Sequence, residues 1–271
     1  MAKFNRLMRP SDFDSPSFVE DVAAATGYPE LQNKTRKTWE HGRILHVLRE
    51  LGYLQPDKTA LGLGTLNEPV PYGLSNYLKH VYRTDYFTDD NVWTKGREKK
   101  IAAAKGRPAF VPETMKYQPD RVSFMEMDAT NMKEFGNDSL DIVYSVSSIE
   151  HFGLRLKETH GSIACMQESE RVLKPGGICL GTTEFLLNDT KHQQFYRRQE
   201  FEEEIINSHN MNAIEPFDYT LDEELYNSEY YFPFVLRDLF KEKHKKFDKY
   251  AGFILANGMV VVPIFFAFIK K

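Results

Sequence analysis

Two glycines and two acids occur at intervals that suit recognition of an adenosine. Gly62 and Gly64 follow a short apolar run, and glycine lets a backbone approach a ligand closely. Asp85 follows about twenty residues later, the usual distance to a carboxylate that binds both ribose hydroxyls. Asp128 and Ala129 end a later apolar run, where an acid can accept a hydrogen bond from an adenine amine. The pattern predicts an adenosine without a pyrophosphate, because the third glycine of a dinucleotide motif is missing.

These residues all lie at the ends of predicted strands. Strands are predicted over 58–64, 80–87, 121–129, 140–148, 177–185, near 212–218 and over 259–269. Helices are predicted around 18–26, 36–53, 69–79, 91–104, 160–173 and 191–208, with a turn at Lys174-Pro175-Gly176-Gly177. Strands that alternate with helices predict a mostly parallel sheet covered on both faces. Ligands of such sheets bind beyond the carboxyl ends of the strands.

Five segments together resemble the class I S-adenosylmethionine-dependent methyltransferases, of the type 11 kind. They are ALGLG (60–64), TDYF (84–87), MDATNM (127–132), LDIVYSVSSIEHFG (140–153) and ERVLKPGG (170–177). The resemblance covers residues 56–190. It implies a Rossmann-like three-layer α/β sandwich, with a mostly parallel seven-stranded sheet and an antiparallel last strand. It also implies S-adenosylmethionine as cofactor and S-adenosylhomocysteine as product.

The first loop departs from the family pattern. The family usually carries an acid two residues before the first glycine, where this chain has Ala60. Glu68, just past the turn, is the nearest acid and is expected to serve the methionine or ribose end of the cofactor. The residues that the resemblance implies for cofactor binding are Gly62, Gly64, Glu68, Asp85, Asp128, Ala129 and Ser145.

Glu150 and His151 follow the fourth strand and are the candidate catalytic residues. One of them would be a general base near the transferred methyl group, and a histidine has a pKa suited to neutral pH. The alternative is a scaffold role, in which His151 packs beside the cofactor and Glu150 bonds the backbone. Glu184, after the fifth strand, would contact the acceptor or cap the next segment.

A metal is not predicted at this position. Relatives that methylate vicinal hydroxyls carry Glu-x-x-Glu-His here and bind a divalent cation. This chain has Ser147 at the first of those positions, and one carboxylate with one imidazole would enclose a cation poorly.

Two segments lie outside the resemblance. We expect residues 1–55 to form an N-terminal helical cap on a methyltransferase domain over 56–271, with a lid-like insertion at 219–258. Tyr230 and Tyr231 of this insertion are expected to bind substrate, by closing over it and excluding water. A structural flap or a contact between two copies is the alternative, so a homodimer is left open.

The predicted function is in-line SN2 methylation of a hydroxyl or amine on a small polar molecule, such as a sugar or natural-product intermediate. The alternative is a catalytically inactive methyltransferase fold that acts as a binding or scaffold protein. Ala60 suggests this alternative, because it stands where the family usually carries an acid. A nicotinamide-dependent dehydrogenase is disfavoured, because no Tyr-x-x-x-Lys follows the fourth strand.

The composition excludes several other classes of protein. The net charge of −4 over 271 residues argues against a broad basic face for nucleic acid. The longest apolar run, 259–269, is too short to span a bilayer, so no membrane partner is predicted. The N-terminus lacks the apolar region of a signal peptide, and two cysteines without metal-site spacing favour a reduced, cytoplasmic setting.

Overall fold

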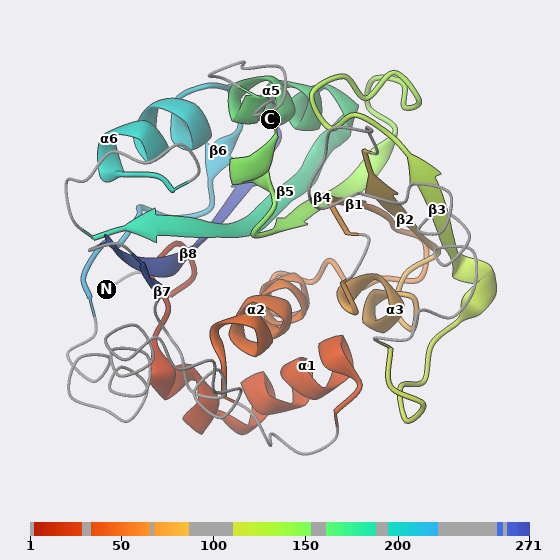
Figure 1. Cartoon of the computed structure of the whole chain (residues 1–271). Coiled ribbons are helices and arrows are strands. Elements are labelled where there is room, and N and C mark those ends of the chain that lie inside the picture. Colours follow the sequence, from red (N-terminus) through yellow and green to blue (C-terminus); the bar gives the residue numbers. More distant parts are fainter. Residues whose placement is uncertain are drawn as a thin grey trace.

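A central sheet with helices on both faces makes up the fold, as Figure 1 shows. The computed structural model describes residues 3–28, 34–65, 68–86, 111–152, 161–187, 195–221, 254–256 and 259–271. The strands are β1 (Thr59–Leu63), β2 (His80–Asp85), β3 (Val122–Glu126), β4 (Leu140–Val146), β5 (Leu173–Leu186), β6 (Asn212–Ala213), β7 (Ile254–Ala256) and β8 (Met259–Ile269). The helices are α1 (Pro16–Thr26), α2 (Arg36–Glu50), α3 (Val70–Leu74), α5 (Gly161–Val172) and α6 (Arg198–Phe201). Short 3-10 turns cover Pro10–Asp14, Pro119–Arg121 and Ile149–His151, and a π-helical turn, Glu202–Ile206, continues α6.

The strand order is β3-β2-β1-β4-β5-β8-β6, and the short β7 pairs with β8. Strands β1 to β5 run parallel, whereas β8 is antiparallel to both β5 and β6. The predicted mostly parallel sheet with an antiparallel last strand is therefore confirmed, and β7 is an addition that the sequence did not predict. The order of the strands reverses between β1 and β4, which is where parallel sheets bind ligands.

Some predicted elements differ in detail from the observed ones. The predicted strand near 212–218 is only the two-residue β6, and the predicted helix over 191–208 is α6 with its π-helical turn. The predicted turn at 174–177 lies inside β5, where Gly176 has φ of 78° and the pairing with β4 shifts register. The predicted helix over 91–104 lies outside the described residues.

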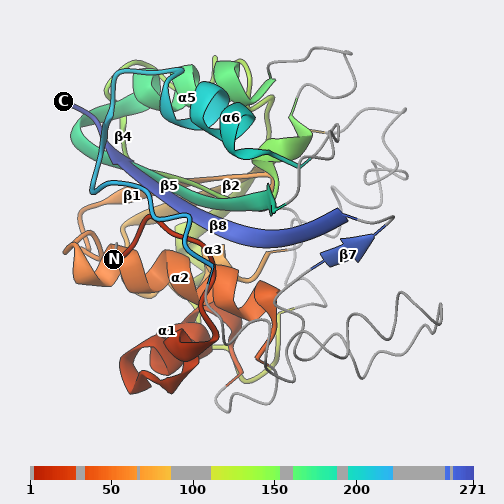
Figure 2. The same cartoon turned by 90° about the vertical axis from the view of Figure 1, so that its left-hand side faces the viewer.

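The N-terminal helices cover one face of the sheet and share its core. Figure 2 shows α1 and α2 on one side of the sheet and α5 and α6 on the other. Trp39, Ile44 and Leu48 of α2 are fully buried in a hydrophobic cluster that also contains residues of β1, β4, β5 and β8. Residues before α1 pair with β8, since the Met8 amide donates to the Pro263 carbonyl at 2.9 Å. Residues 1–55 thus supply part of the layer that positions the site; their division from the rest stays a prediction.

Within the described ranges, no helix combines the length and the apolar character that crossing a membrane requires.

We predict that Gly73→Ala destabilises the protein because α3 lies against the backbone of α1. A Cβ atom at residue 73 would lie 2.4 Å from the Ala24 carbonyl oxygen. The clash should lower the free energy of unfolding by about 1–3 kcal/mol, measured by urea denaturation. Gly136→Ala is the matched control, because among the described residues nothing lies within 4 Å of a Cβ atom there. Equal stability of the two variants would contradict this account of the packing.

Candidate active site

The turn after β1 packs directly on the turn after β4. Gly64 has φ of 68°, in the left-handed region that favours glycine, and a Cβ atom there would lie 2.6 Å from the Ser148 Cβ. The Ser148 hydroxyl donates to the Gly64 carbonyl oxygen at 3.2 Å. The loops that follow β1 and β4, where the strand order reverses, are therefore in direct contact and joined by a hydrogen bond.

Gly62 has a different reason to be glycine. It lies beside Tyr144 in the register of β1 and β4, and a Cβ atom at residue 62 would lie 2.6 Å from the tyrosine oxygen. Tyr144 is fully buried, its hydroxyl has no hydrogen-bond partner within the described part of the chain, and burial raises its pKa well above the ordinary value. Gly62 therefore leaves space for the Tyr144 side chain of the neighbouring strand. The two residues are far apart in the sequence, so the spacing of residues around Gly62 does not predict this contact.

Glu68 is held by the N-terminal helix. Its carboxylate accepts a close hydrogen bond from His41 Nε2, and its Oε1 lies 4.0 Å from Lys37 Nζ. Burial raises the pKa of Glu68, but the nearby His41 and Lys37 outweigh burial and keep the pKa below its ordinary value. An ionised Glu68 therefore links the first loop to α2.

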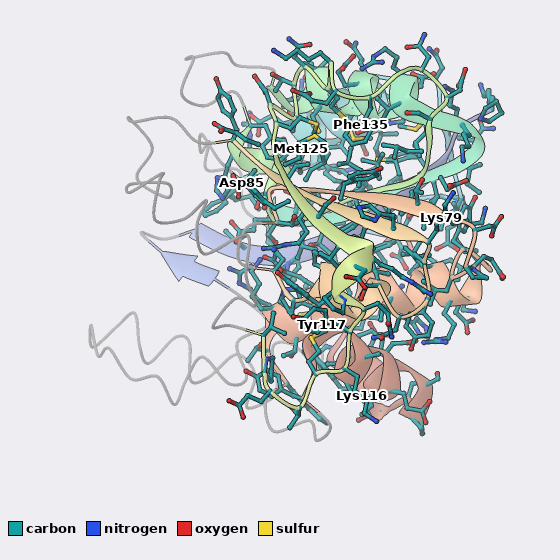
Figure 3. The ribbon with its side chains drawn as sticks, turned by 90° about the vertical axis from the view of Figure 1, so that its right-hand side faces the viewer. Lys79, Asp85, Lys116, Tyr117, Met125 and Phe135 are labelled. Atoms are coloured by element: carbon teal, nitrogen blue, oxygen red, sulfur yellow. The ribbon has the colours of Figure 1, made fainter. Side chains whose placement is uncertain are left out.

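Asp85 and Asp128 lie at the ends of adjacent strands. Figure 3 shows Asp85 at one end of β2 and Lys79, which precedes β2, at the other. Asp85 Oδ1 accepts a hydrogen bond from the Tyr86 amide at 2.8 Å. Asp128 Oδ1 accepts from the Thr130 amide at 2.8 Å and from its hydroxyl at 2.7 Å, which fixes a turn. Asp128 therefore stabilises a local turn, and this structural role is an alternative to contact with adenine.

Two other predicted cofactor residues are buried beside this edge. Ala129 is 7% exposed, and the Ser145 hydroxyl donates to the Leu63 carbonyl oxygen at 3.4 Å across β1 and β4. Tyr230 and Tyr231, the predicted substrate contacts, lie outside the described residues. The cofactor and substrate roles of all these residues stay predictions.

Glu150, just after β4, and Glu184, near the end of β5, form a buried acidic pair. They are 4% and 6% exposed. Glu150 Oε2 accepts a hydrogen bond from the Thr183 hydroxyl at 2.9 Å, while Glu184 Oε1 pairs with Arg36 Nη1 at 3.0 Å. Burial and the neighbouring Glu184 raise the pKa of Glu150 to about 8, so that its carboxyl group holds a proton at neutral pH. Burial also raises the pKa of Glu184, although Arg36 opposes this shift.

The first turns of α2 bring further charges to this pair. Glu40 is fully buried and pairs with Arg36 Nη1 and Lys37 Nζ, both at 2.9 Å. These residues were not predicted from the sequence. The sequence feature that could have indicated them is the position of Glu40, which falls at helical spacing on the same buried stripe as Ile44 and Leu48. A charged residue on such a stripe needs buried partners.

His151 is neutral at physiological pH. Burial, with Lys37 and Arg36 adding to the effect, lowers its pKa to about 4. The expected pKa suited to neutral pH is therefore wrong for His151: the imidazole is neutral and can accept a proton, but it is a weaker base than an exposed histidine. In the described ranges, no three or more His, Cys, Asp or Glu side chains are grouped so that they could hold a metal ion.

The comparisons with known proteins agree with this fold. Residues 74–181 match a family model described as a methyltransferase domain, which covers less than half of the chain. No curated protein sequence matches the chain. This match agrees with the resemblance to the class I methyltransferases, and the Rossmann-like α/β fold that the resemblance implied is the fold observed.

Two solved structures illustrate the likeness of the fold. Phosphoethanolamine N-methyltransferase 2 of Haemonchus contortus, in complex with S-adenosyl-L-methionine, is 16% identical with a TM-score of 0.52, over 98% of this chain and 60% of that chain. A protein provisionally described as a sarcosine dimethylglycine methyltransferase of Galdieria sulphuraria is 12% identical with a TM-score of 0.50, over 83% of each chain. At these identities the likeness shows the fold alone.

We predict that Glu150→Gln changes the pH dependence of stability. Glu150 ionises near 4.5 in the unfolded chain and at about 8 in the folded protein, so between these values the folded state holds the extra proton. The stability contributed by Glu150 is complete below pH 4.5 and is lost as the pH rises through 8. The difference in free energy of unfolding between the variant and the wild type should therefore shift in favour of the variant as the pH rises, by at most about 1.4 kcal/mol per pH unit.

Urea denaturation of both proteins at several pH values in this window measures the difference. Glu113→Gln, at an exposed position, is the matched control and should follow the wild type. Parallel pH profiles for Glu150→Gln and the wild type would show that the folded protein does not protect this proton.

Proposed function

We propose that the protein transfers a methyl group from S-adenosylmethionine to a hydroxyl or amine of a small polar molecule. The observation that carries the proposal is the strand order, which brings the Gly64 turn, Asp85 and Asp128 to one edge in adjacent strands. This edge is the ligand-binding edge of parallel sheets. An adenosine, without a pyrophosphate, fits the acids and the glycine turn found there.

The residues of β1, β2 and β3 would hold the cofactor. The Asp85 carboxylate at the end of β2 suits the two ribose hydroxyls, and Asp128 with Ala129 suits the adenine ring. Backbone groups of the turn at Gly64, with Ser145 and Glu68 close to it, suit the methionine end. When bound, S-adenosylmethionine supplies a methyl group on a positively charged sulfur, which is a good leaving group.

The residues beyond β4 and β5 would receive the acceptor and its proton. A hydroxyl or ammonium group must lose a proton before it attacks carbon. His151 is neutral and free to accept a proton, although its lowered pKa makes it a weak base, whereas Glu150 holds a proton at neutral pH until a ligand changes its surroundings. Burial of these groups excludes water and fixes their orientation, which is most of the work in a direct displacement.

Residues 1–55 and the insertion at 219–258 would form the walls on the acceptor side, with Glu184, Tyr230 and Tyr231 as substrate contacts. The position of Arg36 and Lys37 beside Glu184 and Glu40 supports this for the N-terminal part. A sugar or natural-product intermediate as acceptor, action without nucleic acid, a cytoplasmic location and a homodimer stay predictions.

A catalytically inactive scaffold is the second candidate. The observation that favours it is the engagement of Glu68 by His41 and Lys37, at the loop where the usual family acid is replaced by Ala60. If Glu68 serves only to fasten α2 to the first loop, the methionine end of the cofactor has lost one of its usual partners.

We predict that Asp85→Ala weakens binding of S-adenosylmethionine and S-adenosylhomocysteine by about 10- to 100-fold, because a charge-assisted contact to ribose is lost. Isothermal titration of both ligands measures the effect, with circular dichroism to verify the fold. Asp57→Ala is the matched control, since Asp57 is exposed near the opposite edge of the sheet.

The outcomes separate the two candidate functions. Binding by the wild type that Asp85→Ala weakens and Asp57→Ala leaves unchanged supports the cofactor assignment. Wild-type protein that is folded, free of copurified ligand and unable to bind either compound would favour the scaffold.

A further inference from the structure

The charges around Glu150 are unequal in number. Seven charged or titratable side chains from α2, β5 and the loops after β1 and β4 meet near the carboxyl ends of these strands. We call them the charged cluster: Arg36, Lys37, Glu40, His41, Glu68, Glu150 and Glu184. The cluster contains four carboxyl groups but only two permanent cations, Arg36 and Lys37. Among the described residues Glu40, Glu68 and Glu184 each lie within 4.0 Å of one of these cations, and no such ion pair is formed by Glu150.

Glu150 is thus the carboxyl group of the charged cluster that has no cation beside it among the described residues. Glu40 and Glu184 pair with Arg36, and Glu68 pairs with His41. Glu150 accepts a hydrogen bond from the uncharged Thr183 hydroxyl and interacts with its own backbone amide, and its Oε1 has no hydrogen-bond partner of good geometry within the described ranges. A side chain that is 4% exposed normally satisfies both of its oxygens, so the vacant one marks a place for a ligand group.

The groups that face Glu150 come from several elements. Arg36 and Lys37 act on it from α2, Glu184 from β5, and Tyr196 from the segment before α6, while His151 follows it in the chain. Both cations already pair with other carboxylates. A ligand that satisfies Glu150 in its ionised form must therefore bring a positive charge of its own.

The strand order places this charge on the acceptor side. Asp85 ends β2 and Asp128 follows β3, on one side of β1, whereas Glu150 follows β4 and Glu184 lies near the end of β5, on the other side. In the proposed function the adenosine would therefore lie over β2 and β3, in the other half of the edge from the acidic pair. A group that meets the acidic pair would then belong to the acceptor side.

We propose that the acceptor presents its nucleophile as an ammonium nitrogen, which the carboxyl groups of Glu150 and Glu184 bind beside the methyl group. This inference rests on the proposed function and narrows it from hydroxyl or amine to amine. The bound ammonium nitrogen gives one proton to the Glu150 carboxylate, and its freed lone pair forms the bond to the methyl carbon. The carbon–sulfur bond breaks with its electron pair on sulfur, and Glu150 later passes the proton to solvent.

Sinefungin provides a probe that does not require the acceptor to be known. In this analogue an amine-bearing carbon replaces the sulfur–methyl unit, so an ammonium nitrogen lies at the methyl position. S-adenosylhomocysteine has no charge there, and S-adenosylmethionine has its charge on sulfur. Calorimetric titration of the three compounds separates an ammonium at the acceptor position from the charge of the cofactor.

Wild-type protein should bind sinefungin at least about tenfold more tightly than either other compound, because a buried carboxylate gains a charged partner. Glu150→Gln should lose this preference and bind S-adenosylhomocysteine as before, while the exposed control Glu113→Gln keeps it. At pH 7, sinefungin should release close to one proton from the wild type as Glu150 ionises, and S-adenosylhomocysteine none. Titrations in buffers of different ionisation enthalpy measure this release without any variant.

Three results would overturn the inference. Equal affinity of the wild type for sinefungin and S-adenosylhomocysteine would remove the ammonium site. A preference that Glu150→Gln retains would assign it to other groups. If S-adenosylmethionine and sinefungin both bind more tightly than S-adenosylhomocysteine, and by the same factor, then the acids recognise the cofactor's own charge. Failure of the proposed function is distinct, since neither S-adenosylmethionine nor S-adenosylhomocysteine would then bind.

Discussion

The double ion pair of Arg36 is the interaction on which the geometry of the site depends. Its Nη1 lies 2.9 Å from Glu40 of the same helix and 3.0 Å from Glu184 of β5. A buried carboxylate that loses its cation is costly, so the pairs fix how α2 lies over β5. Thr183, the neighbour of Glu184, then brings Glu150 to its place. One guanidinium therefore orients the helix and the acidic pair together.

Carboxylates at the two edges of the sheet have opposite properties. At the amino edge, Asp141 accepts hydrogen bonds from the Thr59 amide at 2.9 Å and from Lys174 at 3.0 Å. Burial raises its pKa, but these donors outweigh burial and lower it. At the carboxyl edge, Glu150 has too few donors, and its pKa is raised. The supply of donors decides which acid is structural and which can change its charge during a reaction.

The sequence predicted the features that depend on local spacing. The strands of the parallel part of the sheet, the glycine turn after β1 and the position of Asp85 follow from apolar runs and loop residues that lie close together in the chain. The partnership of Gly62 with Tyr144 and the ion pairs of Arg36 join segments far apart in sequence, and helical periodicity does not say which residues meet them. The same periodicity places Glu40 on the buried stripe of α2 but does not identify its partners.

The pairing of the N-terminal segment with β8 has a consequence for biosynthesis. Residues 5–8 bond to β8, with Leu7 bridged to Ile264, and β6 pairs only with β8 among the described strands. β8 is translated after the other strands that the structure describes. Residues 5–8 therefore cannot form these bonds until β8, far later in the sequence, has been made. Until then, the part of the apolar face of α2 that packs on β8 lacks this partner, and such transiently exposed apolar surface is prone to aggregation during synthesis.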